Sequence, residues 1–224
     1  VIVSVPPSTV QRRAATVRAT DRTKAFGQSL SLGPGQTGFS ATGLVSGETI
    51  ASVTLTASGG TGTNDAAGVY EITPSDASGG TFDPANYLLS YQPGTLRVTG
   101  IPFHDWSAGL GNGSHAGDSD KDQIPNLIEY FMALDAERPD APPVTPPAHT
   151  QSGLQFEYRR SKSLEGVSGR VVWKDDLTAP GPWSSEGVTD ERTQDAAGYE
   201  IRRATVPMPP GTRSRFIRIE VFED

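Results

Sequence analysis

Acidic residues recur at alternate positions in residues 118–129, whose sequence is DSDKDQIPNLIE. Carboxylates spaced in this way in a tight loop can turn toward one point, and Ca²⁺ prefers six to eight oxygen ligands. In an EF-hand-type loop the ligands come from positions 1, 3, 5, 7, 9 and 12, and position 7 contributes its backbone carbonyl. The corresponding residues are Asp118, Asp120, Asp122, Ile124, Asn126 and Glu129. The spacing predicts a calcium site, and Mg²⁺ is disfavoured because it demands a smaller octahedral geometry.

Position 6 of the loop departs from the pattern, because Gln123 stands where glycine usually provides a sharp turn with positive φ. The expected strain is on the order of 1 kcal/mol and would weaken ion binding. An alternative interpretation makes Asn126 the N-cap of a helix, with Glu129 as its capping-box partner and Pro125 in the helix entry. That alternative leaves the three aspartates unexplained, since they repel one another without a cation.

Two short helices should flank the loop. Phe103, Trp106 and Leu110 have helical spacing, and a second helix is expected over 126–135, ended by Pro139. The run from 103 to 135 resembles a segment near the C-terminus of many large secreted bacterial proteins, in which a β module follows. Its loop is also similar to thrombospondin type 3 and dockerin calcium loops. The residues that resemble the following β module are Trp173–Leu177, Trp183 and Arg215–Ile219.

The rest of the chain favours short strands. It has 25 glycines and 18 prolines among 224 residues and is only 35% hydrophobic, which is typical of strands joined by turns. Alternating apolar and polar residues predict strands over 16–20, 38–43, 52–57, 68–73, 86–91, 95–99, 154–160, 170–176, 199–206 and 215–222. A hairpin turn is expected at 91–94. The arginines of the last strands should pair with acidic residues across the strands.

A specific resemblance covers residues 14–100. The segments that carry it are 19–27 (ATDRTKAFG), 43–49 (GLVSGET), 68–72 (GVYEI), 86–87 (NY) and 94–98 (GTLRV). In this order they are similar to the signatures of the MBG repeats of large bacterial adhesins, with Phe26-Gly27 in place of the usual Tyr-Gly. The resemblance implies an extracellular stalk or spacer module without enzymatic activity.

These observations predict a mostly β chain with two small antiparallel β-sandwich (Ig-like) modules joined by a helix–calcium loop–helix segment. The expected divisions are an N-terminal arm (1–13), the MBG-like module (14–100), the helix-loop-helix (101–138), a proline-rich linker (139–150) and a C-terminal β module (151–224). The chain starts with Val1 rather than Met, and we interpret it as a processed fragment of a secreted protein.

The first five residues, VIVSV, have the character of a strand although they precede the MBG-like module. They resemble the last strand of a preceding repeat. One interpretation is a remnant lying on the surface. The other is an arm that adds to a sheet of a neighbouring copy, which predicts self-association into a head-to-tail fibre. The predicted partner-binding residues are Val1, Ile2, Val3, Ser4 and Val5.

Several classes of function are disfavoured. Of the net charge of −7, −6 falls within residues 101–140, so a basic nucleic-acid footprint is absent. No apolar run has the length of a membrane helix, and without cysteine there are no thiolate sites. No nucleophile elbow, phosphate loop or dinucleotide fingerprint occurs. His104-Asp105 is more readily a surface pair than half of a triad. Trp106, Trp173 and Trp183 leave a carbohydrate- or surface-binding appendage as the alternative function.

Overall fold

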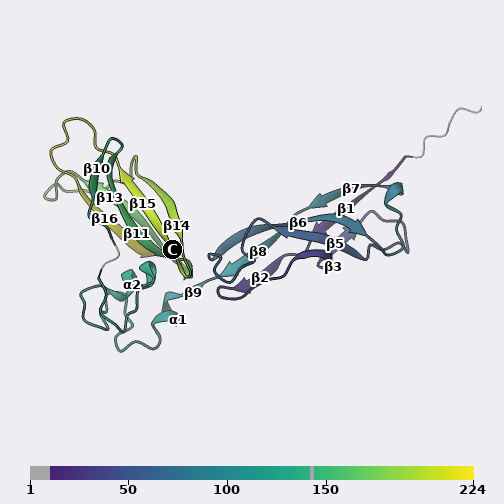
Figure 1. The fold of residues 1–224 in the computed structure, drawn as a ribbon, viewed down its shortest axis with the longest axis horizontal. Coiled ribbons are helices and arrows are strands. Elements are labelled where there is room, and N and C mark those ends of the chain that lie inside the picture. The colour runs from purple at the N-terminus through teal and green to yellow at the C-terminus, as the bar shows by residue number, and fades with distance from the viewer. Residues whose placement is uncertain (1–10, 142–143) are drawn as a thin grey trace, which may run out of the picture. The chain divides into compact units, whose positions relative to one another are not determined.

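The computed structural model describes residues 11–141 and 144–224, and the chain divides into two compact units (Figure 1). Unit 1 ends at Val98, and unit 2 runs from Thr99 to Asp224. Strands hold 46% of the residues and helices 7%, so the prediction of a mostly β fold is confirmed. Residues 1–10 of the predicted arm (1–13), including the predicted partner-binding residues 1–5, lie outside the described residues.

Unit 1 contains a three-stranded and a five-stranded sheet. The first has the order β4 (Phe39–Thr42), β1 (Arg13–Ala19), β7 (Tyr87–Gln92). The second has the order β2 (Arg22–Ala25), β8 (Gly94–Thr99), β6 (Gly68–Ser78), β5 (Ser52–Ala57), β3 (Gly33–Gln36), and a 3-10 turn, Pro84–Asn86, precedes β7.

Alternation along the strands of unit 1 places every second side chain in its core. Ala15, Val17 and Ala19 of β1 are buried, and so are Leu55 of β5 and Leu96 of β8. The core of unit 1 therefore combines small and branched side chains from both sheets with the aromatic rings of Phe82 and Tyr87.

Two details of unit 1 differ from the prediction. The pairing of β1 with β7 is parallel, so the module is not purely antiparallel. The prediction of a hairpin at 91–94 was wrong, because β7 pairs with β1 whereas β8 pairs with β6 in the other sheet. The chain changes sheets at Pro93, which cannot donate a hydrogen bond to a ladder. Glycine is required at position 94 because its backbone lies close to that of Ala19. A Cβ there would lie 2.5 Å from the Ala19 carbonyl oxygen.

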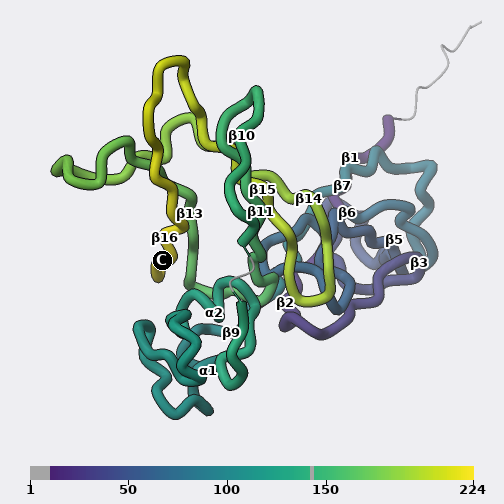
Figure 2. The backbone as a smooth tube through the Cα atoms, turned by 60° about the vertical axis from the view of Figure 1, so that its left-hand side comes forward, coloured from purple at the N-terminus to yellow at the C-terminus, as the bar shows by residue number. Residues whose placement is uncertain are grey.

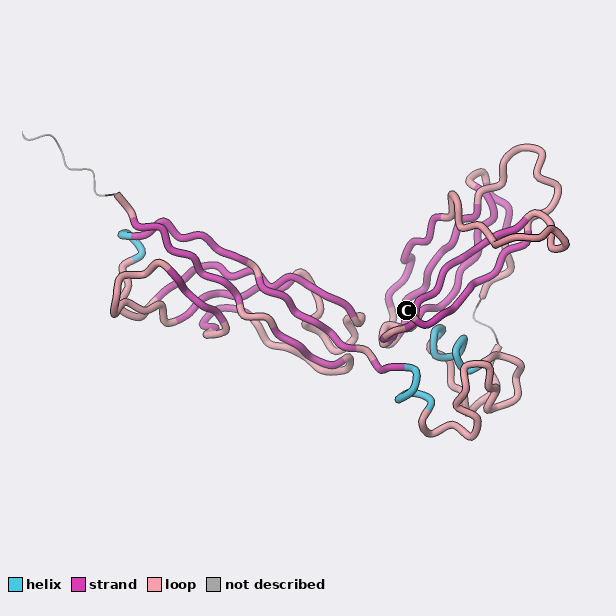
Figure 3. Tube along the Cα trace, turned by 180° about the vertical axis from the view of Figure 1, so that it is seen from behind, coloured by secondary structure: helices cyan, strands magenta, loops and turns pink. Residues whose placement is uncertain are grey.

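Unit 2 has two main sheets and two short helices (Figure 2, Figure 3). The four-stranded sheet has the order β10 (Ala148–Thr150), β11 (Gly153–Ser161), β15 (Tyr199–Val206), β14 (Thr189–Asp195). The second sheet is the antiparallel pair β13 (Val167–Lys174) and β16 (Phe216–Glu223). The remaining elements are β9 (Ile101–Pro102), paired in parallel with β12 (Leu164–Glu165), α1 (Phe103–Ser107) and α2 (Asn126–Met132).

The helical segment shares one core with the β strands of unit 2. Phe103 of α1 and Tyr130 and Phe131 of α2 belong to the same buried cluster as Phe156 of β11 and Val171 of β13. We expected this segment to join two separate modules. The structure instead places it within unit 2, because its apolar face is buried against the sheets.

The second helix ends earlier than predicted. It stops at Met132, because Ala133 adopts a left-handed conformation with φ 54°, whereas we expected Pro139 to end it. The Arg159 guanidinium of β11 donates a hydrogen bond of 3.2 Å to the Ala133 carbonyl, which ties this helix end to the sheet. The expected linker also contacts the sheet, since Val144 forms a β-bridge with Tyr158.

Ion pairs cross the strands of unit 2 as predicted. Arg203 lies 2.8 Å from Glu157, Arg202 lies 2.9 Å from Asp190, and Arg170 lies 3.0 Å from Glu220. These ion pairs neutralise charges on the polar faces of the sheets, and each exposed pair contributes about 0–1 kcal/mol to stability.

Candidate metal centre

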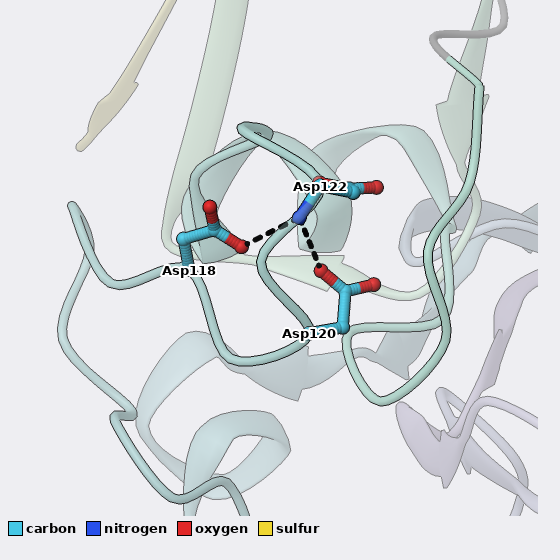
Figure 4. Close-up of side chains that lie close together, drawn as sticks. All are labelled: Asp118, Asp120 and Asp122. Carbon is cyan, nitrogen blue, oxygen red and sulfur yellow. Dashed lines mark hydrogen bonds between the residues drawn. The ribbon is translucent and has the colours of Figure 1, made fainter.

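Backbone amides wrap residues 118–124 around the side chain of Asp118. Its carboxylate accepts hydrogen bonds from the N–H groups of Lys121 (2.7 Å), Asp122 (3.2 Å) and Gln123 (3.0 Å). The N–H of Asp122 lies between the carboxylates of Asp118 and Asp120, as Figure 4 shows. The loop is thus wound tightly, with its alternate aspartates on the inside.

The three aspartates form an acidic cluster. Each of Asp118, Asp120 and Asp122 offers a carboxylate oxygen, and these oxygens lie within 4.8 Å of one another. It is the one such group found within 11–141 and 144–224. Desolvation raises the pKa of Asp120, and the charges of Asp122 and Asp118 raise it further. One oxygen of Asp120 is buried with no hydrogen-bond partner among the described residues.

Glu129, at the last position of the loop pattern, lies on α2 and is fully buried. Neither of its carboxylate oxygens has a hydrogen-bond partner in the described part of the chain. Desolvation raises its pKa to about 7, with further contributions from Asp120 and Asp122. A buried carboxylate without a donor is costly unless a cation or a proton neutralises it.

The capping-box alternative does not hold in this structure. Pro125 is the N-cap of α2, and no side chain caps the helix. The N–H of Asn126 donates to the Gly117 carbonyl at 2.7 Å, and the Glu129 carboxylate accepts no hydrogen bond from it. Burial of Glu129 therefore needs an explanation other than helix capping.

The side chain of Asn126, one of the predicted ligands, makes hydrogen bonds within the chain. Its amide nitrogen donates to the carbonyls of Asn112 (2.5 Å) and Ser114 (3.2 Å), and its side-chain oxygen accepts from Ser119 (3.3 Å). The fully buried side chain thus holds the preceding glycine-rich turn against α2. Our proposed ligand set omits it.

Ile124 and Asp140 complete the surroundings of the loop. The Ile124 side chain is buried in the core of unit 2, and this anchors the backbone whose carbonyl we predicted as a ligand. Asp140 donates its N–H to the Asp122 carboxylate at 2.9 Å, and its charge contributes to the raised pKa of Glu129. Sequence reasoning missed Asp140, because it lies eleven residues beyond the last position of the loop pattern.

The donor set suits a hard divalent cation. The three aspartates, the Ile124 carbonyl and the two oxygens of Glu129 could supply six oxygens, within the six to eight that Ca²⁺ takes. No cysteine or histidine belongs to the cluster, which disfavours zinc. The unpartnered Glu129 carboxylate is the charge that a bound cation would neutralise.

Backbone strain is present where the loop pattern has glycine. Gln123 has φ 76° and Lys121 has φ 68°, both in the left-handed region that non-glycine residues avoid. The prediction of positive φ at position 6 is confirmed by this geometry.

Gln123→Gly should relieve this strain. We expect unit 2 to gain about 1 kcal/mol of stability and calcium to bind more tightly, because glycine adopts φ 76° without steric strain. Chemical denaturation with and without calcium measures both effects. Gln123→Ala is the matched control, since it keeps a Cβ and should bring no gain. Equal stability of the two variants would contradict the strain argument.

The raised pKa of Glu129 predicts how stability depends on pH when calcium is removed. The folded chain holds the proton up to about pH 7, whereas the unfolded carboxyl loses it near pH 4.5. The stabilising contribution of the proton is therefore complete below about pH 4.5 and lost as pH rises through 7, on the order of 1–3 kcal/mol. In saturating calcium the slope should reverse, because only the deprotonated carboxylate binds the ion. Denaturation in chelator and in calcium at pH 5, 6, 7 and 8 tests both signs.

Comparison with known families gives a match within unit 1. Residues 15–97 match the family model of the MBG domain, YGX type. The MBG resemblance is thereby confirmed. MBG domains occur in bacterial surface proteins and are structural modules rather than a known enzyme family. Searches of curated proteins and of solved structures find no match.

The MBG match does not extend into unit 2. His104 and Asp105 are 93% and 66% exposed and bond only at 3.1 Å to each other, as expected for a surface pair. No helix in the described part of the chain combines the length and hydrophobicity needed to cross a bilayer.

The tryptophans of unit 2 form no open aromatic platform. Trp106 packs against Phe103 and Tyr130. Arginine guanidinium groups cover the other two rings, Arg215 at 3.5 Å from the Trp173 centroid and Arg218 at 4.2 Å from that of Trp183. Exposed, coplanar rings would favour a glycan site, so this arrangement weakens the carbohydrate-binding alternative.

Proposed function

We propose that the protein is an extracellular, calcium-stabilised structural and adhesive module of a bacterial surface protein. Ca²⁺ would be held by Asp118, Asp120, Asp122, the Ile124 carbonyl and Glu129. The observation that supports this most strongly is the fully buried Glu129 carboxylate, which lacks any donor among the described residues. The occurrence of MBG domains in surface proteins supports the coarser assignment.

The ion's task would be mechanical, because α2 connects the loop to the rest of unit 2. The Tyr130 hydroxyl donates to the Ile101 carbonyl of β9 and accepts from the Glu165 N–H of β12 at 2.9 Å. The Phe131 ring packs so closely on β13 that a Cβ at Gly169 would meet it at 2.4 Å. A cation bound to Glu129 would fix a helix of seven residues, which is too short to be stable alone.

The ion would also neutralise a local concentration of charge. Residues 101–140 carry a net charge of −6, and four of their acids contribute to the raised pKa of Glu129. Calcium sites in extracellular modules often have a Kd on the order of 10⁻⁴–10⁻³ M, so we expect binding at the calcium concentrations outside cells.

Assembly is the second part of the proposal. We propose that copies associate head to tail through residues 1–5, which would add as a strand to a neighbouring copy. Deleting residues 1–7 should abolish association and leave both units folded. Association that persists after this deletion would exclude the arm.

Calorimetric titration of the full chain with calcium tests the metal site. We expect one ion per chain and at least a tenfold loss of affinity in Asp120→Ala, because one of its carboxylate oxygens lies buried without a partner. Asp105→Ala is the matched control, since this exposed aspartate lies outside the cluster. No heat of binding at millimolar calcium would contradict the proposal.

A further inference from the structure

An apolar groove with a volume of about 300 Å³ opens between the two sheets of unit 2. Ile128 and Met132 of α2 line it at one end, and Val144 and Phe156 line it from the side of the four-stranded sheet. β16 lines it from the other sheet. Val144 is 36% exposed, so its side chain is accessible where it lines the groove.

The groove follows the edge of β16. Ile217, Arg218 and Ile219 all line it, although consecutive residues of a strand point to opposite faces. A surface that contacts both faces must reach around the strand's edge. Within the described residues β16 pairs only with β13, so this edge has no strand partner. Such an edge is a template for a further strand.

The opposite wall of the groove belongs to the four-stranded sheet, near its edge strand β10. β10 is the edge strand of the four-stranded sheet, and Val144 bridges to β11 just before it. Figure 2 shows β13 and β16 as a pair apart from β10, β11 and β15. A strand added beside β16 would therefore place alternate side chains into the apolar space between the sheets.

We propose that this groove accepts residues 1–5 of a second copy of the chain, which pair with the open edge of β16. The groove would be the acceptor site in the proposed head-to-tail assembly, and the inference rests on that assembly. Residues 1–10 contain no charged side chain, which suits a groove whose lining is apolar except for Arg218. In an extended strand Val1, Val3 and Val5 would share one face and could enter the groove, with Ile2 and Ser4 on the other face.

The length of the apolar segment also fits. Five residues span about 17 Å as a strand, shorter than the eight-residue β16. Pro6 and Pro7 follow, and neither has an N–H to donate to a ladder, so pairing ends at Val5. The segment would thus add one short strand with a defined end.

Sedimentation velocity of full-chain variants in saturating calcium tests the proposal. Val3→Lys impairs the donor strand, and Val144→Lys places a charge at the groove mouth of the acceptor. Each should raise the dissociation constant for self-association by at least about tenfold. Val69→Lys, at a 66% exposed position of unit 1, is the matched control and should associate like the parent.

Mixing the two impaired variants gives the decisive readout. Val3→Lys retains an intact groove and Val144→Lys retains an intact donor, so an equimolar mixture should form one-to-one dimers and nothing longer. A monomeric parent would overturn both the acceptor and the assembly. Association lost in Val3→Lys but kept in Val144→Lys would overturn the acceptor alone. Failure of the calcium site would appear separately, in the calorimetric titration.

Discussion

Glu129→Gln should have opposite effects with and without calcium. In chelator at pH 8 we expect the variant to be more stable than the parent by about 1–3 kcal/mol, because it removes a buried, unpaired carboxylate. In saturating calcium we expect the parent to be the more stable, because glutamine cannot supply two anionic oxygens to the ion. Urea denaturation in both conditions measures the crossing.

The matched control is Glu137→Gln, an exposed carboxylate of the same acidic segment. It should leave both stabilities within about 0.5 kcal/mol of the parent. A Glu129→Gln variant that is less stable than the parent in both conditions would mean that the carboxylate has a purely structural role, and would contradict the metal site.

Phe131→Ala should cause the largest loss of stability. This ring is fully buried between α2 and the sheets, so its removal should cost about 3–5 kcal/mol. Since the helices and the sheets share one core, we expect the loop and the C-terminal strands to unfold in a single transition. Calcium affinity should fall with it, because the folded loop becomes less populated.

Leu55→Ala in unit 1 is the control for Phe131→Ala. It is equally buried but belongs to the separate core of the MBG-type module. It should destabilise unit 1 and leave calcium binding unchanged. If Phe131→Ala melts the acidic loop while the C-terminal strands stay folded, the common core of unit 2 would not be the cooperative unit.

The sequence predicts the loop better than its surroundings. The alternate aspartates identify the acidic cluster, because spacing within a tight turn determines which side chains meet. Burial of Glu129 and the clamp made by Asn126 depend on how α2 packs against distant strands. Asp140 joins the cluster through tertiary folding of residues beyond the pattern.

The strands show the same division between local and tertiary information. Alternation located β5 and β15 with the bounds that the structure gives them. It did not show that Pro93 separates two sheets, because a turn and a change of sheet use the same residue types. The helical segment also has an apolar face whose partner cannot be identified from spacing alone, and that partner is the C-terminal sheet.

Thermal unfolding followed by tryptophan fluorescence tests the central claim most directly. All three tryptophans, Trp106, Trp173 and Trp183, lie in unit 2, so the signal reports this unit alone. In the full chain, we expect millimolar calcium to raise the melting temperature of unit 2 by several degrees over that in chelator. Each tenfold excess of ion over Kd adds about 1.4 kcal/mol of stability. Identical melting curves in calcium and in chelator would contradict the account.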